Sequence, residues 1–395
     1  MRGLVLPLLA ALALILACTT TEPQPTPDVP HGLVAVSGLD SRVDLAWEEP
    51  TSGEPEHYRV YCSEAGGAFE QLVELESDGT EYTDASAVNG TYYEYQITAL
   101  TGDEESDPSE TAWATPYYDF EWAWTSAEVY WLPTEGDGVF YCIERPVDVA
   151  YLCRISTDGE HELQSDQMCW GFPAVGPANI YTMGIPLQSA MLRVWTMDLE
   201  WVESIGFLET EYKELGFYSG ELFTINVDTG VVDVLDISGN YLRSIGEPGH
   251  EGPGMTDPFG LDVSDGGTLY VVDMMEESLL AFDAVTGELV WRISAPDLPA
   301  DFRFPSDAAV APDGFVYLVS GLDQEFLVID SAGRQIKRVP FDWTEDEVYH
   351  LAVADDFTVC LSRGEREGNG MVAYRPVGLS GNEAPPVVAL GGEVR

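Results

Sequence analysis

The sequence predicts an all-β protein built from a small β-sandwich followed by a six-bladed β-propeller. The 395 residues exceed what a single ordinary domain needs. Apolar and polar residues alternate in short runs that end at turn residues, as they do in strands of half-buried sheets. After residue 116, units of four short strands recur every 41 to 47 residues. Repeats of that length and content are typical of propeller blades.

The composition makes the chain strongly acidic. Seventeen basic residues stand against sixty-nine acidic ones, for a formal net charge of −52. Phosphate binding needs clustered Lys and Arg, so the composition excludes nucleic acid as a partner, and it excludes electrostatic attraction to an anionic membrane surface for the same reason. Because 45% of the residues are hydrophobic and 11% aromatic, we expect folded cores and not a disordered polyanion.

The first segment is an apolar run over residues 4–17 that follows a single arginine. A helix of that length reaches about 21 Å, less than the roughly 30 Å of a bilayer core, so we interpret residues 1–17 as a signal peptide. The run ends in Ile-Leu-Ala-Cys, which resembles the lipobox of bacterial lipoproteins and implies lipidation of Cys18. An ordinary secretory signal is the alternative. Both interpretations export the chain.

A tether is expected over residues 18–29. The stretch TTTEPQPTPDVP after Cys18 is rich in proline and has no aliphatic residue before Val29, which is typical of an extended spacer. The resemblance to lipoproteins implies attachment to the membrane through the lipid anchor only. Thr19 and Thr20 lack the aspartate that marks inner-membrane retention in some bacteria, which favours the outer membrane and leaves the periplasmic or surface face open.

Residues 30–116 form the predicted sandwich, with short alternating strands separated by turns. The segments V-D-L-A-W ending at Trp47, Y-R-V-Y from Tyr58 and G-T-Y-Y-E-Y-Q-I-T-A from Gly90 resemble a fibronectin type III domain. The resemblance implies that Tyr93 is the corner tyrosine, whose hydroxyl bonds to the backbone. Such domains usually act as spacers, and we expect the aromatic rings to pack in the core.

Residues 117–395 form the predicted propeller. The clearest unit begins at Pro258, and the next repeats its pattern from Pro305. Their glycine and aspartate placement resembles NHL-type repeats. We expect the strand around residues 118–124 to complete the last blade, with residues 387–390 as the rival. The apolar residues that mark the second strand of each blade are Phe140, Tyr181, Phe223, Tyr270, Tyr317 and Val359.

A candidate site follows from aligning the blades, because the first strand of every blade lines the central tunnel. The alignment brings Glu214, Asp307 and His350 to equivalent positions at one tunnel mouth. An Asp, a Glu and a His can bind a divalent cation or act as acid and base, and some similar six-bladed propellers are calcium-dependent lactonases or lyases, which makes calcium the candidate cofactor. Simple solvation at a wet tunnel mouth is the alternative. The equivalent positions in the other blades are Val129, Gly171 and Gly260.

Other sequence motifs that indicate catalysis or metal binding are absent or weak. The sequence has no phosphate-binding G-x-x-x-x-G-K, no nucleophile elbow G-x-S-x-G and no D-x-D-x-D-G calcium loop, and its five histidines show no paired metal spacing. An acidic turn at residues 135–138 can hold calcium loosely, but we interpret it as solvated surface.

Five cysteines remain after Cys18, an odd number. Cys142 and Cys153 occupy matching positions on the second and third strands of the first blade, so one interpretation is a cross-strand disulfide. The other is that all five act as small buried hydrophobic residues.

Two functions fit these observations. The order of anchor, tether, spacer and ring, without a catalytic motif, favours a lipid-anchored, non-catalytic cell-envelope protein whose propeller binds a protein or a glycan. The alternative is a metal-dependent propeller hydrolase or lyase that uses Glu214, Asp307 and His350. Clustering of these three side chains within about 5 Å of one point separates the two hypotheses, because shared coordination requires it.

Overall fold

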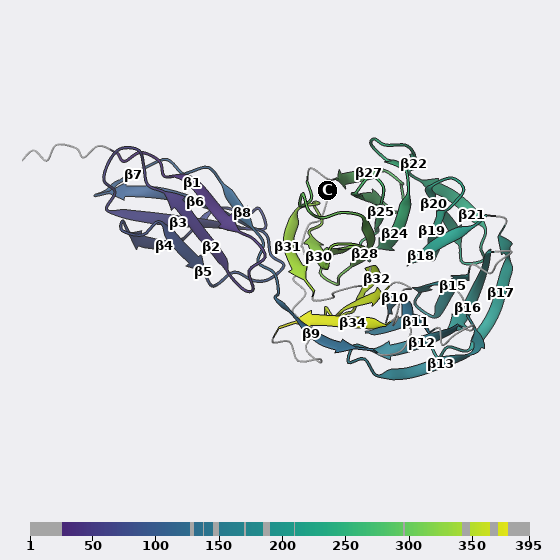
Figure 1. Cartoon of the computed structure of the whole chain (residues 1–395). Coiled ribbons are helices and arrows are strands. Elements are labelled where there is room, and N and C mark those ends of the chain that lie inside the picture. Colours follow the sequence, from purple (N-terminus) through teal and green to yellow (C-terminus); the bar gives the residue numbers. More distant parts are fainter. Residues whose placement is uncertain are drawn as a thin grey trace, which may run out of the picture. The chain divides into compact units, whose positions relative to one another are not determined.

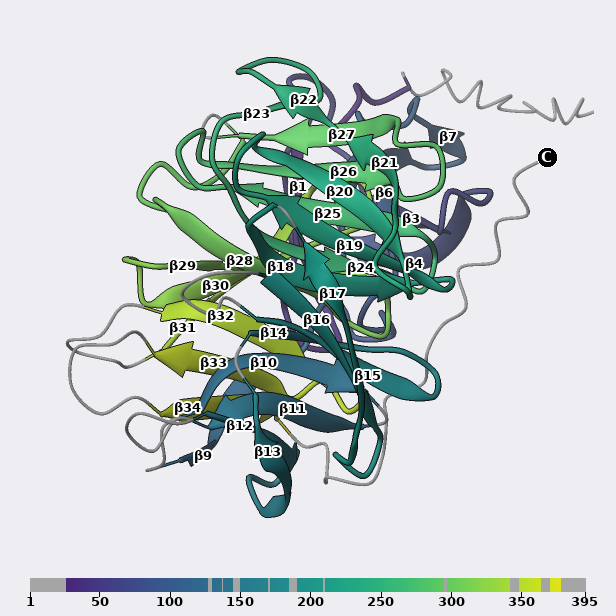
Figure 2. The ribbon, with the colours of Figure 1, turned by 90° about the vertical axis from the view of Figure 1, so that its right-hand side faces the viewer.

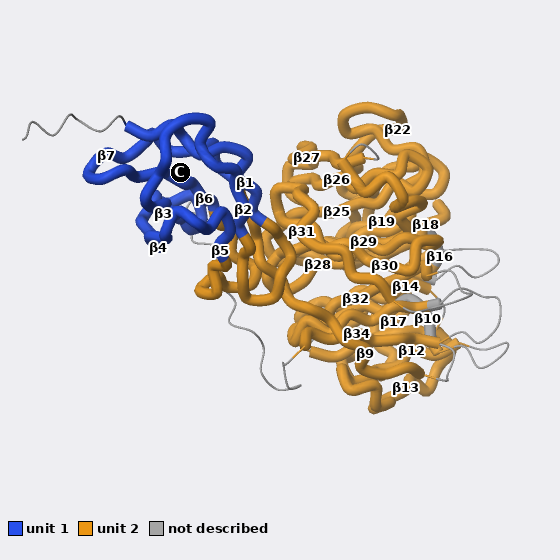
Figure 3. Tube along the Cα trace, turned by 60° about the vertical axis from the view of Figure 1, so that its left-hand side comes forward, with its two compact units in different colours: residues 1–35, 45–82, 94–112 blue, residues 36–44, 83–93, 113–395 orange. Residues whose placement is uncertain are grey.

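The computed structural model shows a chain made of β-strands, with no helix in the part of the chain it describes. Accordingly, the described residues contain no helix long and apolar enough to cross a membrane. The chain divides into two compact units (Figure 3). One contains residues 45–82 and 94–112 together with the chain up to residue 35, and the other contains residues 36–44, 83–93 and 113–395. The structure describes residues 26–126, 130–136, 138–144, 150–169, 171–184, 190–208, 210–294, 297–341, 348–363 and 370–377.

The sandwich module has two sheets. One has the order β1-β2-β5, and the other has the order β4-β3-β6-β7 with β8 also paired to β6. Inward residues alternate along β3 and β6, as the sequence pattern predicts. Trp47 packs edge-on against Tyr58 at a ring-centroid distance of 5.5 Å, and both rings are buried. The strands are β1 (His31–Val36), β2 (Val43–Glu48), β3 (His57–Glu64), β4 (Glu70–Glu76), β5 (Glu81–Asp84), β6 (Tyr93–Thr101), β7 (Glu104–Glu105) and β8 (Ala112–Ala114).

The corner contact of Tyr93 is present. The backbone N–H of Val88 donates to the Tyr93 hydroxyl at 3.1 Å, and the ring of Tyr93 is buried. The turn that leads into this strand has Gly90 at a φ of 79°, a left-handed conformation that glycine adopts without a steric penalty.

The second unit contains six four-stranded antiparallel sheets in chain order (Figure 1). Each of the six apolar residues used to align the blades lies on the second strand of its sheet, so the predicted repeat is confirmed. The first three sheets are β10 (Tyr130–Gly136), β11 (Val139–Glu144), β12 (Tyr151–Ser156) and β13 (His161–Met168); β14 (Phe172–Val175), β15 (Asn179–Gly184), β16 (Ala190–Thr196) and β17 (Trp201–Leu208); and β18 (Tyr212–Tyr218), β19 (Glu221–Asn226), β20 (Val231–Asp236) and β21 (Tyr241–Ile245).

The last three sheets complete the ring. A short parallel pair, β22 (Glu247–Pro248) and β23 (Gly254–Met255), precedes the fourth. The sheets are β24 (Pro258–Val263), β25 (Thr268–Asp273), β26 (Ser278–Asp283) and β27 (Leu289–Ile293); β28 (Pro305–Val310), β29 (Val316–Ser320), β30 (Glu325–Ile329) and β31 (Gln335–Pro340); and β32 (Val348–Val353), β33 (Val359–Arg363), β34 (Met371–Pro376) and β9 (Phe120–Thr125).

Strand β9 precedes the first of these sheets in the chain and pairs with β34, the last strand of the sixth sheet. This confirms the predicted closing strand, whereas the rival segment, residues 387–390, lies outside the described residues. Each inner strand contacts the next around the ring, and β32 contacts β10. The inner strands therefore surround the centre of the ring in Figure 1, and Figure 2 shows the same ring turned by 90°.

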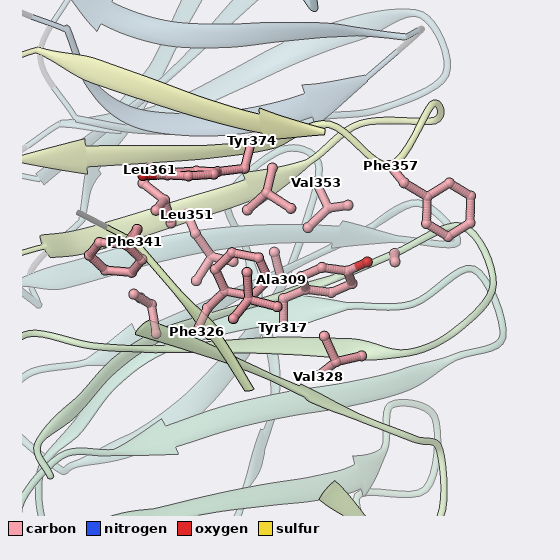
Figure 4. Close-up of a cluster of buried hydrophobic side chains, with 14 of the residues drawn as sticks. Ala309, Tyr317, Phe326, Val328, Phe341, Leu351, Val353, Phe357, Leu361 and Tyr374 are labelled. Carbon is pink, nitrogen blue, oxygen red and sulfur yellow. The ribbon is translucent and has the colours of Figure 1, made fainter. Parts of the chain in front are cut away.

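Adjacent blades are held together by apolar faces. In the fifth blade, Tyr317 and Phe326 stack with ring centroids 5.5 Å apart. They form one buried cluster with Leu351 and Val353 of β32 in the sixth blade (Figure 4). Such strands are apolar on both faces because a blade packs against a neighbour on each side, which explains the near-continuous hydrophobic runs of β29 and β30.

Candidate functional site

The inner strands share a local irregularity where the candidate residues lie. The pairing register with the second strand shifts in β10, β18, β24, β28 and β32, whereas β14 pairs regularly. A β-bulge of this kind bends the strand and turns a side chain out of the ladder, and bulges are common beside functional sites. The repeated bulge re-aims the side chains that face the tunnel.

The three predicted residues are brought together. His350 Nδ1 lies 3.4 Å from Glu214 Oε1 and 3.5 Å from Asp307 Oδ2. One ligand atom from each residue lies within 4.8 Å of the other two. The residues come from β18, β28 and β32, in the third, fifth and sixth blades, and their side chains are 7–15% exposed. We call these three residues the tunnel cluster.

Backbone amides hold Asp307 in place. Its Oδ1 accepts from the N–H of Ala308 at 2.9 Å, and its Oδ2 accepts from the N–H of Leu351 in the next blade at 3.0 Å. A Cβ added at Gly260 would lie 2.3 Å from Asp307 Oδ1 and 2.7 Å from its Cα. Gly260, the aligned position of the fourth blade, therefore leaves the room that Asp307 occupies.

Asp262 repeats this link one blade earlier. One of its oxygens accepts from Val263 N–H at 2.7 Å, and the other accepts from Val310 N–H in the fifth blade at 2.8 Å. Two carboxylates thus each tie an inner strand to the inner strand that follows it. No signal in the sequence indicated Asp262, because the aligned positions in the fifth and sixth blades are Ala309 and Ala352.

Glu214 occupies a strained backbone position. Its φ is 57°, in the left-handed region that non-glycine residues rarely adopt. Such positions cost of order 1–3 kcal/mol and persist where the surroundings impose them. The Thr224 hydroxyl, which is within hydrogen-bonding range of the Lys213 carbonyl too, donates to the carbonyl of Glu214 at 2.8 Å, so the bulge is supported from the second strand of the blade.

Aromatic rings surround the imidazole of His350. Phe172 meets it edge-on at a centroid distance of 6.1 Å, and Phe259 lies nearly parallel to it at 6.4 Å. Lys213 Nζ lies 4.8 Å from the centroid of the Phe259 ring. These rings restrict water around the imidazole and strengthen its interaction with the two carboxylates.

The electrostatics of the cluster favour bound protons. Burial raises the pKa of Glu214 to about 8, against a smaller lowering by His350. For His350, burial alone would lower the pKa, but the carboxylates of Glu214 and Asp307 raise it overall. The tunnel cluster therefore retains protons to a higher pH than isolated side chains do.

The cluster lies in the wall of a cavity of about 830 Å³ that all six inner strands line. Burial raises the pKa of Asp262 to about 7 and that of Glu135 to about 8, and nearby carboxylates add to both shifts. The acidic turn that the sequence led us to interpret as solvated surface thus places Glu135 in the cavity wall. The acidic residues of this wall are Glu135, Glu214, Asp262, Asp265, Asp307, Asp313 and Asp355.

This donor set can hold a divalent cation. Carboxylates suit Mg²⁺, Ca²⁺ and Mn²⁺, whereas imidazole suits Zn²⁺, Fe²⁺ and other transition metals. Calcium takes six to eight oxygen ligands, and the cluster offers two carboxylates and one nitrogen. The residues therefore fit a transition-metal ion such as Mn²⁺ or Zn²⁺ better than they fit calcium. Groups with a pKa near 7 or 8 can also give or take protons near neutral pH.

The remaining predicted positions have mixed outcomes. Cys18 and Val129 lie outside the described residues. Cys142 and Cys153 are direct partners across β11 and β12, but Cys142 is a free thiol, so the disulfide is not formed. Cys142 Sγ faces the Cys153 carbonyl at 3.9 Å, while Cys153 Sγ faces Glu144 at 3.3 Å. The two sulfur atoms turn to different partners.

A second group of ligand-type residues was not predicted. Glu144, Cys153 and His161 place one ligand atom each within 4.8 Å of the others. They come from β11, β12 and β13 of the first blade. We call them the first-blade cluster. Only its cysteine was noted in the sequence, because nothing in the spacing of the other two indicates that they meet.

Comparison with known proteins identifies the sandwich module. The model of the fibronectin type III domain matches residues 28–112. Over 106 residues the chain is 33% identical to an amylopullulanase of Thermoanaerobacterium saccharolyticum, and over 105 residues 36% identical to an amylopullulanase of Thermoanaerobacter thermohydrosulfuricus. Each match covers 26% of this chain, but the chain spans only 8% and 7% of these curated relatives.

Several solved structures are similar to shares of this chain. A luciferin-regenerating enzyme is 12% identical with a TM-score of 0.48 and covers 66% of this chain and 96% of its own. Virginiamycin B lyase from Staphylococcus aureus is 11% identical with a TM-score of 0.46 and covers 66% and 100%. An Fn3-like protein from Clostridium thermocellum is 28% identical with a TM-score of 0.21 and covers 23% and 95%. With the family match and the observed sheets, residues 28–112 are a fibronectin type III domain.

Proposed function

We propose that the propeller is a metal-dependent hydrolase or lyase that works at its tunnel mouth. The observation that carries this proposal is the convergence of Glu214, Asp307 and His350, whose ligand atoms lie within 4.8 Å of one another in the wall of a large cavity. Residues that are merely solvated at a tunnel mouth would keep their charges exposed to water, because burying an unpaired charge is costly.

The roles of the chain's own groups follow from their environment. Asp307 is oriented by two amides and stays in place to bind a cation. Glu214, with a pKa of about 8, and Asp262, with a pKa of about 7, can exchange protons with a substrate near neutral pH. A bound divalent ion supplies Lewis-acid polarisation or an activated water. Because the wall is rich in carboxyl groups, we expect a neutral or cationic substrate and exclusion of polyanions.

The first test is cation binding. Titration of the detergent-purified full chain with Mn²⁺, Zn²⁺ and Ca²⁺ at pH 8 should raise its melting temperature, by an amount equivalent to about 2.7 kcal/mol at one hundred times the dissociation constant. Glu214→Gln and Asp307→Asn should reduce this stabilisation. The matched control is Asp233→Asn, which changes a buried carboxylate of the third blade that hydrogen-bonds to Tyr212 and Asn226.

The second test is turnover. A panel of neutral aryl esters and lactones, assayed by acid release with the added ion, should show activity that is lost in Glu214→Gln and kept in Asp233→Asn. Equal stabilisation by metal in all variants, or equal turnover, would rule out the tunnel cluster as the site.

A non-catalytic binding function is the second candidate. The observation that favours it is the structural use of Asp262 and Asp307, which accept amide hydrogen bonds from the following blade. A structural role in joining the blades through hydrogen bonds would explain these carboxylates without a substrate. The propeller would then bind a protein or a glycan as a scaffold, and metal would stabilise it without any turnover.

For location, we propose an exported protein that is anchored in the cell envelope, at the outer membrane, through lipid on Cys18, with the fibronectin type III domain as a spacer. The support is the apolar run before Cys18 and the proline-rich stretch after it. Cys18→Ser should move the protein from the membrane fraction to the soluble fraction. Unchanged partitioning would contradict lipidation.

A further inference from the structure

The first-blade cluster has the donor set of a different kind of metal site. Cys153 Sγ lies 3.3 Å from Glu144 Oε2, and His161 Nε2 lies 4.0 Å from the same oxygen. In a tetrahedral zinc site with bonds of about 2.0–2.3 Å, neighbouring ligand atoms lie roughly 3.3–3.8 Å apart. The three residues are therefore already close to the separations that a single ion requires.

The sheet itself assembles this cluster. Cys142 pairs with Cys153 and Glu144 pairs with Tyr151, so Glu144 and Cys153 are diagonal neighbours on one face of β11 and β12. The ladder between β12 and β13 shifts register twice, once between Tyr151 and Cys153 and once further along β12. These bulges bend the outer strand, and His161 comes within reach of Glu144.

We propose that Glu144, Cys153 and His161 bind one Zn²⁺ ion. A thiolate and an imidazole favour zinc over calcium or magnesium. Binding releases the thiol proton to solvent, after which the thiolate, the carboxylate and the doubly charged ion sum to zero net charge. A neutral assembly of this kind avoids the penalty of burying an uncompensated charge. The protein supplies three ligands, and because the side chain of His161 is 39% exposed, solvent can supply the fourth.

Burial of the thiol argues against a nucleophilic function. Cys153 is fully buried, so a substrate cannot reach its sulfur atom, whereas a structural zinc ligand needs no such access. A zinc ion here would join three adjacent strands of the first blade and would stabilise the folded propeller through linkage. This inference is independent of the function proposed for the tunnel cluster.

Cobalt substitution tests the proposal directly. The full chain is stripped with a chelator, Co²⁺ is added, and the thiolate-to-cobalt charge-transfer band and the visible bands of tetrahedral cobalt are recorded, followed by displacement with Zn²⁺. The wild type should show both sets of bands. Cys153→Ser should abolish the charge-transfer band, and Cys142→Ser, the matched thiol that faces another way, should keep it.

A second variant, at the partly exposed ligand His161, keeps the test valid if loss of the buried thiol prevents folding. His161→Ala changes a side chain on the outer strand, so it should fold, and near-ultraviolet circular dichroism checks this. It should weaken Zn²⁺ binding by more than the roughly 10–100-fold that loss of an outer-shell partner costs. Glu214→Gln should leave the thiolate-to-cobalt charge-transfer band unchanged, because the tunnel cluster contains no thiol. Absence of a charge-transfer band in the folded wild type, or its persistence in Cys153→Ser, would overturn the proposal.

Discussion

The tunnel cluster and the first-blade cluster each unite three ligand-type side chains within 4.8 Å, yet the fold assembles them in opposite ways. The tunnel cluster takes one residue from the inner strand of each of three blades, whereas the first-blade cluster takes all three from neighbouring strands of one sheet. The first depends on closure of the ring and the second on strand register alone. Changes in the tunnel cluster should therefore lower the free energy of unfolding of the propeller more than changes in the first-blade cluster.

Their chemistry differs as well. The tunnel cluster offers two carboxylates and an imidazole in a wall that contains further carboxyl groups, and burial raises the pKa of Glu214 and Asp262. The first-blade cluster offers one sulfur, one nitrogen and one carboxylate. A proton-retaining site without sulfur and a site with a soft thiolate ligand thus lie in the same propeller, and selective metal titration should distinguish them.

The largest expected effect comes from Asp307→Ala. It leaves the amides of Ala308 and Leu351 without their acceptor and His350 without one of its carboxylates. Breaking a buried pair of this kind typically costs about 3–5 kcal/mol. Urea unfolding should show a loss of that size, whereas Glu144→Ala in the first-blade cluster should cost less. Equal losses at the two positions would contradict the difference in coupling.

A smaller effect is expected for Gly260→Ala. The added methyl group would meet Asp307 at 2.3–2.7 Å, and overpacking of this kind costs about 1–3 kcal/mol. The same substitution at Gly266, where the nearest atom to an added Cβ is 3.7 Å away, should stay within about 0.5 kcal/mol. If both variants unfold alike in urea, Gly260 does not make room for Asp307.

The most gradual effect is the pH dependence. Glu214 has an ordinary pKa of 4.5 and a pKa of about 8 in the folded protein, so between these values the folded state binds more protons than the unfolded state. The contribution of Glu214 to the free energy of unfolding is therefore largest below pH 4.5 and falls as pH rises to about 8.

Glu214→Gln removes this proton exchange and isolates its contribution. The wild type should lose stability relative to the variant between pH 5 and pH 8, and the metal ion should reverse that loss because binding replaces the protons. Parallel stability curves for the two proteins would show that Glu214 is not desolvated. The variant should leave the first-blade cobalt spectrum unchanged at every pH.

Much of the fold could be predicted from sequence periodicity. Residues such as Tyr270 and Tyr317, 47 positions apart, mark the second strand of successive blades, because each blade must bury the same face against its neighbour. The closing strand from Phe120 to Thr125 was also predictable, since its apolar residues match an outer blade strand. The tunnel cluster followed from the same repeat, because equivalent positions of a ring converge at its axis.

The directions of side chains and their burial could not be predicted from the sequence. The alignment placed Cys142 opposite Cys153 correctly but did not show that their sulfur atoms face different groups. Glu135 was interpreted as solvated because an isolated acidic turn usually is, and only the approach of the other inner strands buries it. Neither result is encoded in local spacing.

The sequence alone thus determined the two modules, the blade repeat and the three residues that meet at the tunnel mouth, because periodic burial and ring symmetry leave a readable pattern. The tertiary structure decided which side chains meet. Glu214 pairs with His350 across blades, and Glu144 lies beside Cys153 and His161 across bulged strands. These contacts depend on bulges and on desolvation. Both are produced by packing among distant segments, so no local pattern specifies them.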